Sequence, residues 1–510
     1  MGKLFKYLKQ HAMVILAIIV VLFVQAFCDL SLPTYTSDIV NVGIQQGGID
    51  TTVPEQIGKT DLENLLLLVP QEDAGTVQDA YREGTKEDLD TGEEFVVLKD
   101  AVRNDEEQMN ELFDILGKPM FLAEGLSSDS EELDAMKEQM LSQMPAGSVQ
   151  GDVSMFDILR VLPQEQRESM VREMEQQVSD MPDTMLEQTA TVYIENIYRS
   201  LGVDMDAMQT NYILITGAKM LGLAFLGLLA SVTVGLLASR TAAAVGRDLR
   251  RNVFTKVVGF SSSEFDHFST ASLITRSTND IQQIQMVIVM MLRMVLYAPI
   301  IAVGGIYKVI NTNVSMTWII ALGVVLILGV VLLLFLCVMP KFRILQKMVD
   351  RVNLVTREIL TGLSVIRAFH TEKHEEERFD KANTDLTKTN LFVNRAMTLM
   401  MPAMMLIMNG ISILIMWVGA HGVDNGQMQV GDMMAFIQYT MQIIMAFLMI
   451  CMISIMLPRA AVAAGRVDEI LTSETAIKDK EEPEHIPEAG KGLVEFDHVS
   501  FRYPGAGKDV

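Results

Sequence analysis

The chain is 510 residues long and combines a net charge of −23 with a mean hydropathy of +0.28. These two values conflict unless charged and apolar residues are segregated along the chain. Residues 51–209 contain 36 Asp+Glu and 11 Lys+Arg, a net charge of −25, so the rest of the chain is close to neutral at +2. This distribution excludes a single globular domain, a disordered acidic protein and a nucleic-acid-binding protein, which would need a basic face.

The cysteines and histidines give no sign of a metal or nucleophilic centre. Cys28, Cys337 and Cys451 fall within or beside apolar runs, and no pair has metal or redox spacing. His370 and His374 are four residues apart, as metal ligands on a helix can be, but Thr371 stands where a zinc protease carries glutamate. We therefore predict no metal site and no catalytic residue in this chain, and no disulfide framework for its acidic segment.

Six apolar stretches are long enough to cross a membrane, since a span needs about 20 mainly apolar residues. They are Ala12–Leu32, Tyr212–Leu237, Val287–Ile310, Trp318–Met339, Met397–Ala420 and Met433–Leu457. The first stretch follows basic residues, as the core of a signal peptide does. No small-residue cleavage site follows it, so we expect the first helix to be retained.

Basic residues predict the orientation of these spans, because Lys and Arg favour the cytoplasmic side. Clusters precede span one and follow spans two, four and six: Lys3, Lys6, Lys9, Arg240, Arg247, Arg250, Arg251, Lys341, Arg343, Lys347, Arg351, Arg459 and Arg466. All of them lie on one side if both termini are cytoplasmic. The sequence thus predicts a multi-pass protein of the plasma membrane, with residues 46–209 outside the cytoplasm.

Two long cytoplasmic stretches, residues 239–286 and 340–396, contain little Pro or Gly and have apolar residues at helical spacing. We expect spans two to five to continue as helices well beyond the bilayer. Helices of that length need a support, for which a second copy or a homologue is the natural candidate.

Short motifs within these stretches carry a family resemblance. The first stretch contains Glu264-Phe265-Asp266-His267-Phe268-Ser269-Thr270, and the second contains Thr361-Gly362-Leu363-Ser364-Val365-Ile366-Arg367-Ala368-Phe369. Both resemble the intracellular loops of six-span ATP-binding-cassette (ABC) exporters of the B-family, or type IV, half-transporter kind. The segment Leu32–Asn41 also resembles the end of the first span in Firmicutes-type members. The resemblance covers roughly residues 1–45 and 205–510.

The resemblance implies a fold and a division into domains. The fold would be an all-α membrane protein with six long transmembrane helices, cytoplasmic extensions and an inserted, mainly helical extracytoplasmic domain. The first strand of a C-terminal α/β nucleotide-binding domain would follow. We expect an N-terminal elbow and first span (1–45), an acidic insertion (46–209), spans two to six with two coupling loops (210–471), a linker (472–492) and the start of the nucleotide-binding domain (493–510).

In such exporters each cytoplasmic loop carries a short coupling helix, which presents aromatic or apolar side chains to a nucleotide-driven partner. The resemblance assigns this role to Phe265, Asp266, Phe268, Phe369, His370 and Phe379. Exposed aromatic residues at a loop tip usually mark an interface. The alternative is that these phenylalanines simply pack the helical hairpins.

The C-terminal residues Val494–Pro504 alternate like a strand. In the family an aromatic residue at the position of Tyr503 stacks on adenine, although a tyrosine there can equally be a turn residue. The following Gly505–Lys508 is no phosphate loop, because Arg502 replaces the first glycine and Asp509 replaces the magnesium-binding hydroxyl. ATP and Mg would therefore be bound by a part of the nucleotide-binding domain that lies beyond this chain. We expect the chain to be truncated and not to hydrolyse ATP by itself.

Methionines are abundant in the spans, with 37 in the chain. Their flexible thioethers suit a cavity that accepts assorted amphiphiles, and ordinary helix packing or lipid contact is the alternative. The cavity candidates are Arg293, Met404, Met408, Met441, Met445 and Met449. Arg293 would meet an anionic group there, or it would reach the cytoplasmic interface by snorkelling.

The acidic segment is long enough for a domain of its own. We predict a capping box from Ser128 to Glu131, helices near Met155–Leu162, Gln164–Met181 and Thr184–Leu201, and a strand at Glu94–Leu98. The domain would cap the outer gate, select a cationic peptide or bind a surface partner. The alternative is a solvated face without a ligand.

The sequence as a whole predicts the transmembrane subunit of an ATP-driven exporter for amphiphilic drugs, lipids or peptides, which works by alternating access. It would work as a dimer with a second half-transporter, as a homodimer or, by preference, a heterodimer, within the lipid bilayer and without nucleic acid. The alternative is a six-span receptor or sensor whose acidic ectodomain binds a ligand without transport.

Overall fold

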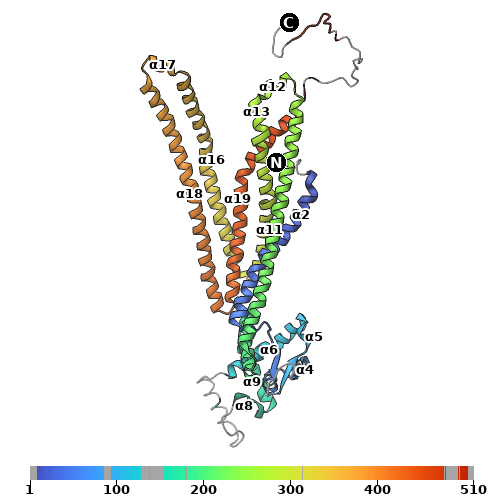
Figure 1. The fold of residues 1–510 in the computed structure, drawn as a ribbon. Helices are drawn as coiled ribbons and strands as arrows, with labels where there is room; N and C mark the ends of the chain where they lie inside the picture. The colour runs from blue at the N-terminus through green and yellow to red at the C-terminus, as the bar shows by residue number, and fades with distance from the viewer. Residues whose placement is uncertain are drawn as a thin grey trace. The chain divides into compact units, whose positions relative to one another are not determined.

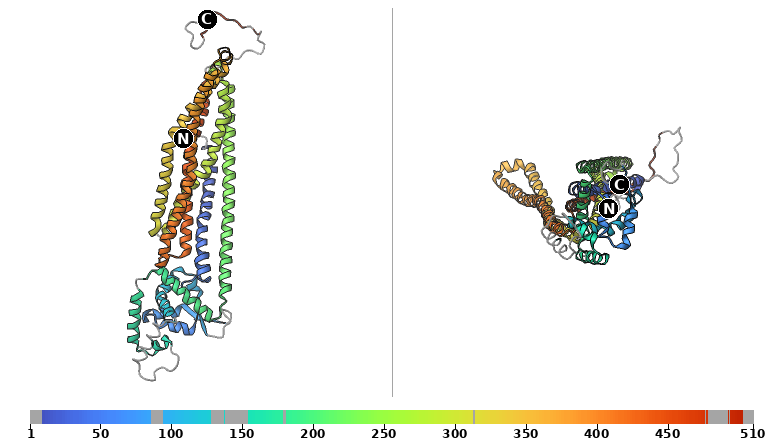
Figure 2. Two further views of the ribbon diagram at one scale, coloured as in Figure 1. Left: turned by 90° about the vertical axis from the view of Figure 1, so that its left-hand side faces the viewer. Right: turned by 90° about the horizontal axis from the view of Figure 1, so that it is seen from below.

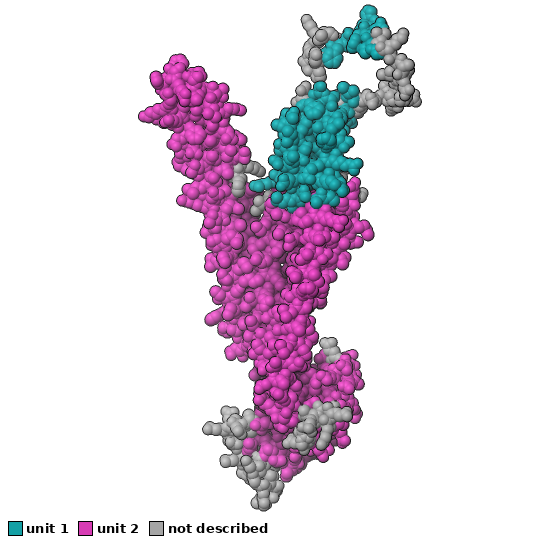
Figure 3. All heavy atoms as spheres, in the orientation of Figure 1, with its two compact units in different colours: residues 1–9, 243–286, 459–510 teal, residues 10–242, 287–458 magenta. Residues whose placement is uncertain are grey.

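The computed structural model describes residues 9–85, 94–127, 137, 154–178, 181–312, 314–475, 477, 492 and 494–502. The chain divides into two compact units. One unit comprises Met1–Lys9, Ala243–Met286 and Arg459–Val510, and the other comprises Gln10–Ala242 and Val287–Pro458 (Figure 3).

Six long helices are apolar enough to cross a membrane. They are Ala12–Gln45 (α2, Ala12–Asp38, continued by the π-helix η2, Ile39–Gln45), Met205–Val258 (α11), Thr270–Thr312, Thr317–Thr361 (α16), Glu372–Asp424 (α18) and Val430–Thr472 (α19). The third consists of α13 (Thr270–Thr275), η3 (Arg276–Asp280), α14 (Ile281–Met290), η4 (Met291–Val295) and α15 (Tyr297–Thr312). Each predicted span lies inside one of these helices, so the prediction of six spans is confirmed. The 54 residues of α11 amount to ~80 Å at ~1.5 Å per residue, and the hydrocarbon core is ~30 Å thick.

Short helices lie between the long ones: η1 (Lys9–His11) before α2, α12 (Ser262–Phe268) after α11, η5 (Val314–Met316) before α16 and α17 (Leu363–Ala368) after it. In the second unit α16 and α18 run side by side, with α17 at their common end (Figures 1 and 2). The helices of this unit share an apolar core that includes Leu30 of α2, Ile319 of α16, Ile411 of α18 and Phe436 of α19. The helices approach closely in this core, since a Cβ at Gly323 would lie 2.5 Å from Ile411 Cδ1.

The segment Leu32–Asn41, in the second half of the first long helix, is hydrogen-bonded to the start of the sixth long helix. Ser37 Oγ donates to Asp432 Oδ1 at 2.8 Å, and the backbone N–H of Gly431 donates to Asn41 Oδ1 at 2.7 Å. A Cβ at Gly431 would lie 2.5 Å from Asn41 Oδ1, which leaves room only for glycine. The polar side chains of this segment therefore satisfy buried groups at a helix crossing.

The described residues of the acidic insertion form a mixed domain. Three strands, β1 (Gln56–Gly58), β2 (Tyr81–Glu83) and β3 (Phe95–Leu98), make an antiparallel sheet in the order β1-β3-β2. The helices are α3 (Lys59–Leu66), α4 (Gln71–Ala80), α5 (Asp100–Arg103), α6 (Glu106–Ser127), α8 (Met155–Val161), α9 (Gln164–Val178) and α10 (Asp183–Ser200) (Figure 1). The predicted strand and three predicted helices correspond to β3, α8, α9 and α10. The capping box predicted at Ser128–Glu131 lies outside the described residues, whereas Ser154 and Asp157 form one before α8.

This domain has a hydrophobic core of its own. Fully buried side chains come from its successive elements, among them Leu65, Leu116, Ile158 and Ile194. The two chain connections to the helices lie against each other, since a Cβ at Gly48 would be 2.8 Å from Gln209 Cα, and Gln209 Nε2 donates to the carbonyl oxygen of Gly43 at 2.8 Å. The domain is therefore an insertion whose two ends are neighbours, as is common for inserted domains.

The strand predicted at Val494–Pro504 is not confirmed. Residues 494–502 are neither helix nor strand, and no described segment pairs with them. A strand is stable only when neighbours accept and donate its backbone hydrogen bonds. Tyr503 and the residues after it lie outside the described residues.

Candidate functional site

The loop after α11, which the sequence predicts to be cytoplasmic, begins with a tightly capped short helix in the first unit. Ser261 precedes α12, and its backbone N–H and side-chain Oγ both donate to Glu264 Oε2, at 2.6 and 2.7 Å. Ser263 Oγ donates to Glu264 Oε1 at 2.8 Å. Glu264 is buried, and its hydrogen bonds satisfy the helix start, so this turn is held in one conformation.

The two phenylalanines of α12 differ in exposure because one of them stacks on another aromatic ring. Phe268 is only 6% exposed, stacks on Phe260 at a centroid distance of 5.7 Å, and has the Arg276 guanidinium 5.1 Å from its ring centroid. Phe265 is 42% exposed. The structure therefore corrects the expectation that both side chains are contact residues: Phe268 packs the hairpin, because the amphipathic turn must bury one of its aromatic rings.

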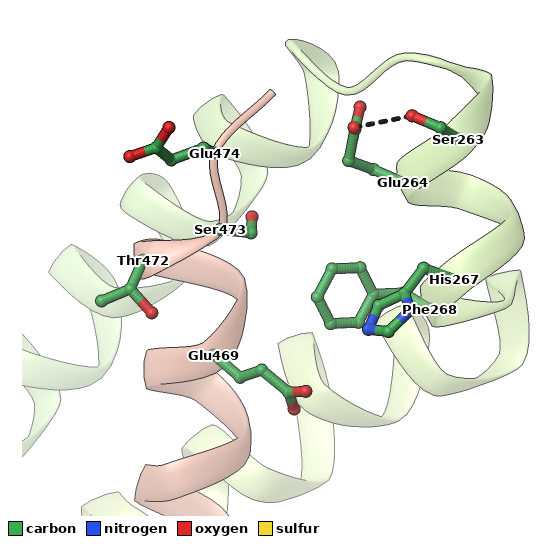
Figure 4. Close-up of a pocket in the computed structure, with 8 residues that line it drawn as sticks. All are labelled: Ser263, Glu264, His267, Phe268, Glu469, Thr472, Ser473 and Glu474. Carbon is green, nitrogen blue, oxygen red and sulfur yellow. Dashed lines mark hydrogen bonds between the residues drawn. The ribbon is translucent and has the colours of Figure 1, made fainter. Parts of the chain in front are cut away.

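Arg276 ties this loop to the last turns of α19. Its Nη1 donates to the carbonyl oxygen of Arg466 at 2.8 Å and to Glu469 Oε2 at 2.6 Å. Arg466 in turn lies 3.4 Å from the buried carboxylate of Asp280. An open pocket of about 410 Å³ lies between α12 and the end of α19 (Figure 4); its lining is Ser263, Glu264, His267, Phe268, Glu469, Thr472, Ser473 and Glu474.

The loop after α16, in the second unit, exposes its aromatic residue. Phe369 follows α17 and is 75% exposed. His370 has a positive φ of 54°, and the N–H of Thr371 donates to the carbonyl oxygen of Ile366 at 3.1 Å. This is the Schellman arrangement that ends a helix, here with histidine in the conformation usually taken by glycine.

Salt bridges and a small apolar pocket support that tip. Arg378 of α18 pairs with Glu358 of α16 and with Glu375. Phe379 is 37% exposed and lines a pocket with Ile359, Leu360, Leu363 and Ile366, whose rim also carries Glu372, Glu375 and Glu376. Of the six residues assigned to coupling, Phe265, Phe369, His370 and Phe379 thus lie at the surface of a helix tip, and Phe268 is buried. The side chain of Asp266 lies outside the described residues.

The predicted cavity residues differ in burial. Met404 is buried in the core shared by the helices, and Met408 and Met449 pack against that core. Met441 is half-buried, Met445 is exposed, and Arg293 lies exposed on η4. The assignment of these positions to a substrate cavity stays a prediction.

Sequence reasoning missed a polar cluster inside the predicted spans. Tyr297 Oη of α15 donates to Asp29 Oδ2 of α2, and Gln442 Nε2 of α19 donates to the carbonyl oxygen of Asp29 at 3.0 Å. The signal was available, because Asp29 is the one carboxylate in the apolar run Ala12–Leu32. An ionisable residue in such a run indicates a functional position.

The six apolar helices, with short helices at the loops between them, define a multi-pass membrane protein. The ABC transporter transmembrane region matches residues 183–447, and the chain belongs to this family. The resemblance that the loop motifs carry is thereby confirmed.

Several curated proteins are similar to this chain. An uncharacterized ABC transporter ATP-binding protein of Mycobacterium bovis is 36% identical over 318 residues, which are 62% of this chain and 55% of that protein. One of Bacillus subtilis is 35% identical over 293 residues, 58% of this chain and 51% of that protein. A protein of Mycobacterium bovis named fatty acid ABC transporter ATP-binding/permease protein is 27% identical over 260 residues, 50% of this chain and 40% of that protein. The chain spans about half the length of the curated relatives it matches.

Proposed function

We propose that the chain is the membrane-spanning part of an ATP-driven exporter that works as a dimer of half-transporters. The observation that carries this proposal is the exposed apolar tip of the α16–α18 hairpin. Leu360, Val365 and Phe369 are 68%, 59% and 75% exposed there. Exposed side chains of this size in one place mark a protein contact.

The length of the hairpin explains why a protein rather than lipid must cover this tip. The 45 residues of α16 and the 53 of α18 correspond to ~68 and ~80 Å of helix. The hydrocarbon core takes up only ~30 Å of that length. The basic residues that follow the apolar part of α16 favour a cytoplasmic position for the rest. A nucleotide-binding domain, of this subunit or of its partner, is the contact we propose.

The names and lengths of the relatives support ATP as the energy source. They are named ATP-binding proteins, and about half of their length lies outside the match. A nucleotide-binding domain that holds ATP and Mg, with Tyr503 stacked on adenine, would account for that difference. Its closure would move the tips, and long rigid helices would carry the movement into the membrane.

The substrate class remains amphiphilic in this proposal, with drugs, lipids and peptides as members. The printed name of one relative attributes fatty acid to that protein, which is 27% identical to this chain. The acidic insertion, placed outside the cytoplasm by the basic residues, would lie where the substrate leaves. Family membership argues against the receptor alternative, because this family consists of transporters.

ATP-dependent movement of an amphiphile by the full-length protein tests the proposal. The purified protein is reconstituted into liposomes, and accumulation of a radiolabelled amphiphile is compared with ATP, with a non-hydrolysable ATP analogue and without nucleotide. We expect accumulation only with ATP. Equal accumulation under all three conditions, across a panel of cationic, neutral and anionic amphiphiles, would refute export.

A further inference from the structure

The polar cluster around Asp29 lies at membrane depth. Asp29 belongs to the first predicted span, and its neighbours Tyr297 and Gln442 lie within spans three and six. A Cβ at Gly227, in the middle of span two, would lie 3.7 Å from Asp29 Oδ1. Four helices therefore meet at this one residue, three of them at its carboxylate and α19 at its backbone carbonyl oxygen, within a single compact unit.

The hydrogen bonds of the cluster leave acceptor atoms available. Tyr297 donates to Asp29 Oδ2 and also interacts with the side chain of Gln25. Gln442 uses its Nε2 to bind the Asp29 carbonyl oxygen, so its Oε1 is left as an acceptor. That Oε1 is buried and accepts no hydrogen bond from the described residues. Such an orphaned acceptor is costly and calls for a donor or a positive charge.

Asp29 has no cationic partner in the described part of the chain. The ion pairs found there do not include it, and Arg293, one helical turn before Tyr297, does not pair with it. A carboxylate at this depth is expensive to maintain, and intramembrane carboxylates mark substrate or ion pathways. By contrast Asp38, nine residues further along the same helix, lies within electrostatic range of Lys219 and Lys308.

We propose that Asp29, Tyr297 and Gln442 form a binding site for the positive group of a lipophilic organic cation. Asp29 supplies the charge, Gln442 Oε1 supplies a second acceptor, and the Tyr297 ring offers a face that attracts cations. The apolar residues of α2 and α15 around these groups suit the hydrophobic part of such a molecule. The site deepens the proposed function. Binding of the cation does not depend on that function, whereas movement of the cation across the membrane rests on it.

The chemistry of the cluster disfavours an anionic head group. A carboxylate and an amide oxygen repel a second carboxylate, so a fatty acid would gain nothing here. This distinguishes Asp29 from Arg293, for which the sequence left open either contact with an anionic group or snorkelling to the cytoplasmic interface. For ligands of the same shape, a site at Asp29 would bind the cation more tightly, whereas a site at Arg293 would bind the anion more tightly.

Binding of two shape-matched ions to the full-length protein tests the site without requiring transport. Radiolabelled tetraphenylphosphonium and tetraphenylborate have similar size and opposite charge, and equilibrium dialysis against detergent-solubilised protein gives both affinities. We expect the wild type to bind the cation at least about tenfold more tightly than the anion, and Asp29→Asn to weaken cation binding at least about tenfold, since tenfold corresponds to ~1.4 kcal/mol. Asp29→Glu should retain most of the binding.

Matched controls separate a binding site from a general loss of charge or structure. Asp38→Asn removes one negative charge from the same helix and should leave both affinities within about twofold. Size-exclusion chromatography checks that each variant remains monodisperse. Equal cation binding by wild type and Asp29→Asn, or the same loss in Asp38→Asn, would overturn the proposal.

A measurement on the wild type covers the case in which Asp29→Asn does not fold. Dicyclohexylcarbodiimide, a lipid-soluble carboxyl reagent, is applied with and without tetraphenylphosphonium, and labelled peptides are quantified by mass spectrometry. We expect the cation to reduce labelling of Asp29 at least about fivefold without protecting Asp38. Labelling of Asp29 that is indifferent to the cation refutes the site. If cation binding is confirmed while ATP drives no transport, the site stands and the proposed export fails.

Discussion

The loops that follow α11 and α16 use their phenylalanines differently. Phe268 is buried under Arg276 in the first loop, whereas Phe369 is exposed at the end of the second. The same residue type therefore supports one tip from inside and offers a contact at the other. Which role each ring has is a property of single side chains, and single substitutions can test it.

Phe369→Ala should uncouple ATP hydrolysis from transport. An exposed aromatic anchor at an interface contributes about 2 kcal/mol or more, so transport and substrate-stimulated ATPase activity should fall roughly tenfold or more. ATP affinity, measured by nucleotide binding to the full-length protein, should not change. Phe225→Ala is the control, because Phe225 is 60% exposed but lies well inside α11 rather than next to a loop. Equal losses in both variants would contradict the assignment of Phe369 to coupling.

A second prediction at this scale concerns the Glu55–Arg103 pair of the inserted domain, whose atoms Oε1 and Nε are 2.7 Å apart. Burial raises the pKa of Glu55 above 4.5, and Arg103 counteracts that rise. The folded state thus binds the proton more tightly than the unfolded state, so this carboxyl lowers stability as pH rises from 4.5 through its raised pKa. Arg103→Gln should raise this pKa further and destabilise the domain by about 1–2 kcal/mol at pH 7, less than for a fully buried pair.

Hydrogen exchange of β1 and α5 at pH 7 and pH 5 measures this effect. The difference between Arg103→Gln and wild type should shrink as the pH is lowered, because protonation of Glu55 in the folded protein removes the charge that Arg103 pairs with. Lys59→Gln serves as the control, because its partner Glu94 is 82% exposed and solvent screening leaves such a pair with little effect on stability. A difference in protection between Arg103→Gln and wild type that grows on acidification would show that the predicted pH dependence of the Glu55 contribution has the wrong sign.

Among the elements, the crossing of η2 and α11 determines how the inserted domain is attached. Gly48 has a φ of +88°, and a Cβ there would meet the backbone of Gln209. Both features require glycine. The attachment of the inserted domain after η2 therefore depends on the single residue Gly48, which has no side chain.

Gly48→Ala should destabilise this crossing by about 1–3 kcal/mol, because it adds strain at positive φ and a clash with backbone. Gly75→Ala is the matched control of opposite sign. Gly75 lies in α4 with nothing within 4 Å of an added Cβ, and alanine there should stabilise the helix by about 0.5–1 kcal/mol. Thermal unfolding of the full-length protein, with hydrogen exchange to locate the change, distinguishes the two. Unchanged protection of η2 and the start of α11 in Gly48→Ala would count against the crossing.

For the whole molecule, the insertion is separable from the helices because it has its own core and adjacent ends. It nevertheless touches the turn between α18 and α19, where Thr184 Oγ1 donates to the carbonyl oxygen of Gly426. The insertion thus reaches the helices at its ends and at one further point. Its net charge of −25 over residues 51–209 would concentrate cations beside them.

Replacing residues 51–201 by a short Gly-Ser linker should leave the helical part folded and inserted in the membrane. The expected readouts are wild-type expression in the membrane fraction and a monodisperse peak in size-exclusion chromatography. Transport of a cationic amphiphile should fall several-fold at low ionic strength and less at high ionic strength, because salt screens the attraction. Loss of membrane insertion would contradict a separable domain, and unchanged transport at every ionic strength would leave the acidic face without a ligand role.

Much of the fold could be predicted because its signals are local. Twenty apolar residues define a span wherever they occur, and all six were found in this way. The sheet was harder, since β1 and β2 are three residues long and gain stability only from β3 between them. Such pairing depends on residues 56–98 coming together, which no short window of sequence contains.

The candidate site was predicted in kind but not residue by residue. The loops were located by their motifs, but Phe268 and Phe265 look alike in sequence, and only packing against Phe260 and Arg276 separates them. Methionine spacing along α19 suggested a common surface, whereas the burial of each methionine depends on which helix lies beside it. Asp29 was overlooked because its partners, Tyr297 and Gln442, are about 270 and 410 residues away.

The sequence by itself determined that this is a six-span membrane protein with a separate acidic insertion, because hydropathy and charge act on each segment independently of its neighbours. It also determined the family, through motifs at the loops and the end of the first span. Only the tertiary structure decided which aromatic residue is exposed at a tip, how the insertion is joined at Gly48, and that Asp29 meets a tyrosine and a glutamine. Those features are contacts between distant segments, and a contact has no energy until the chain has folded to make it.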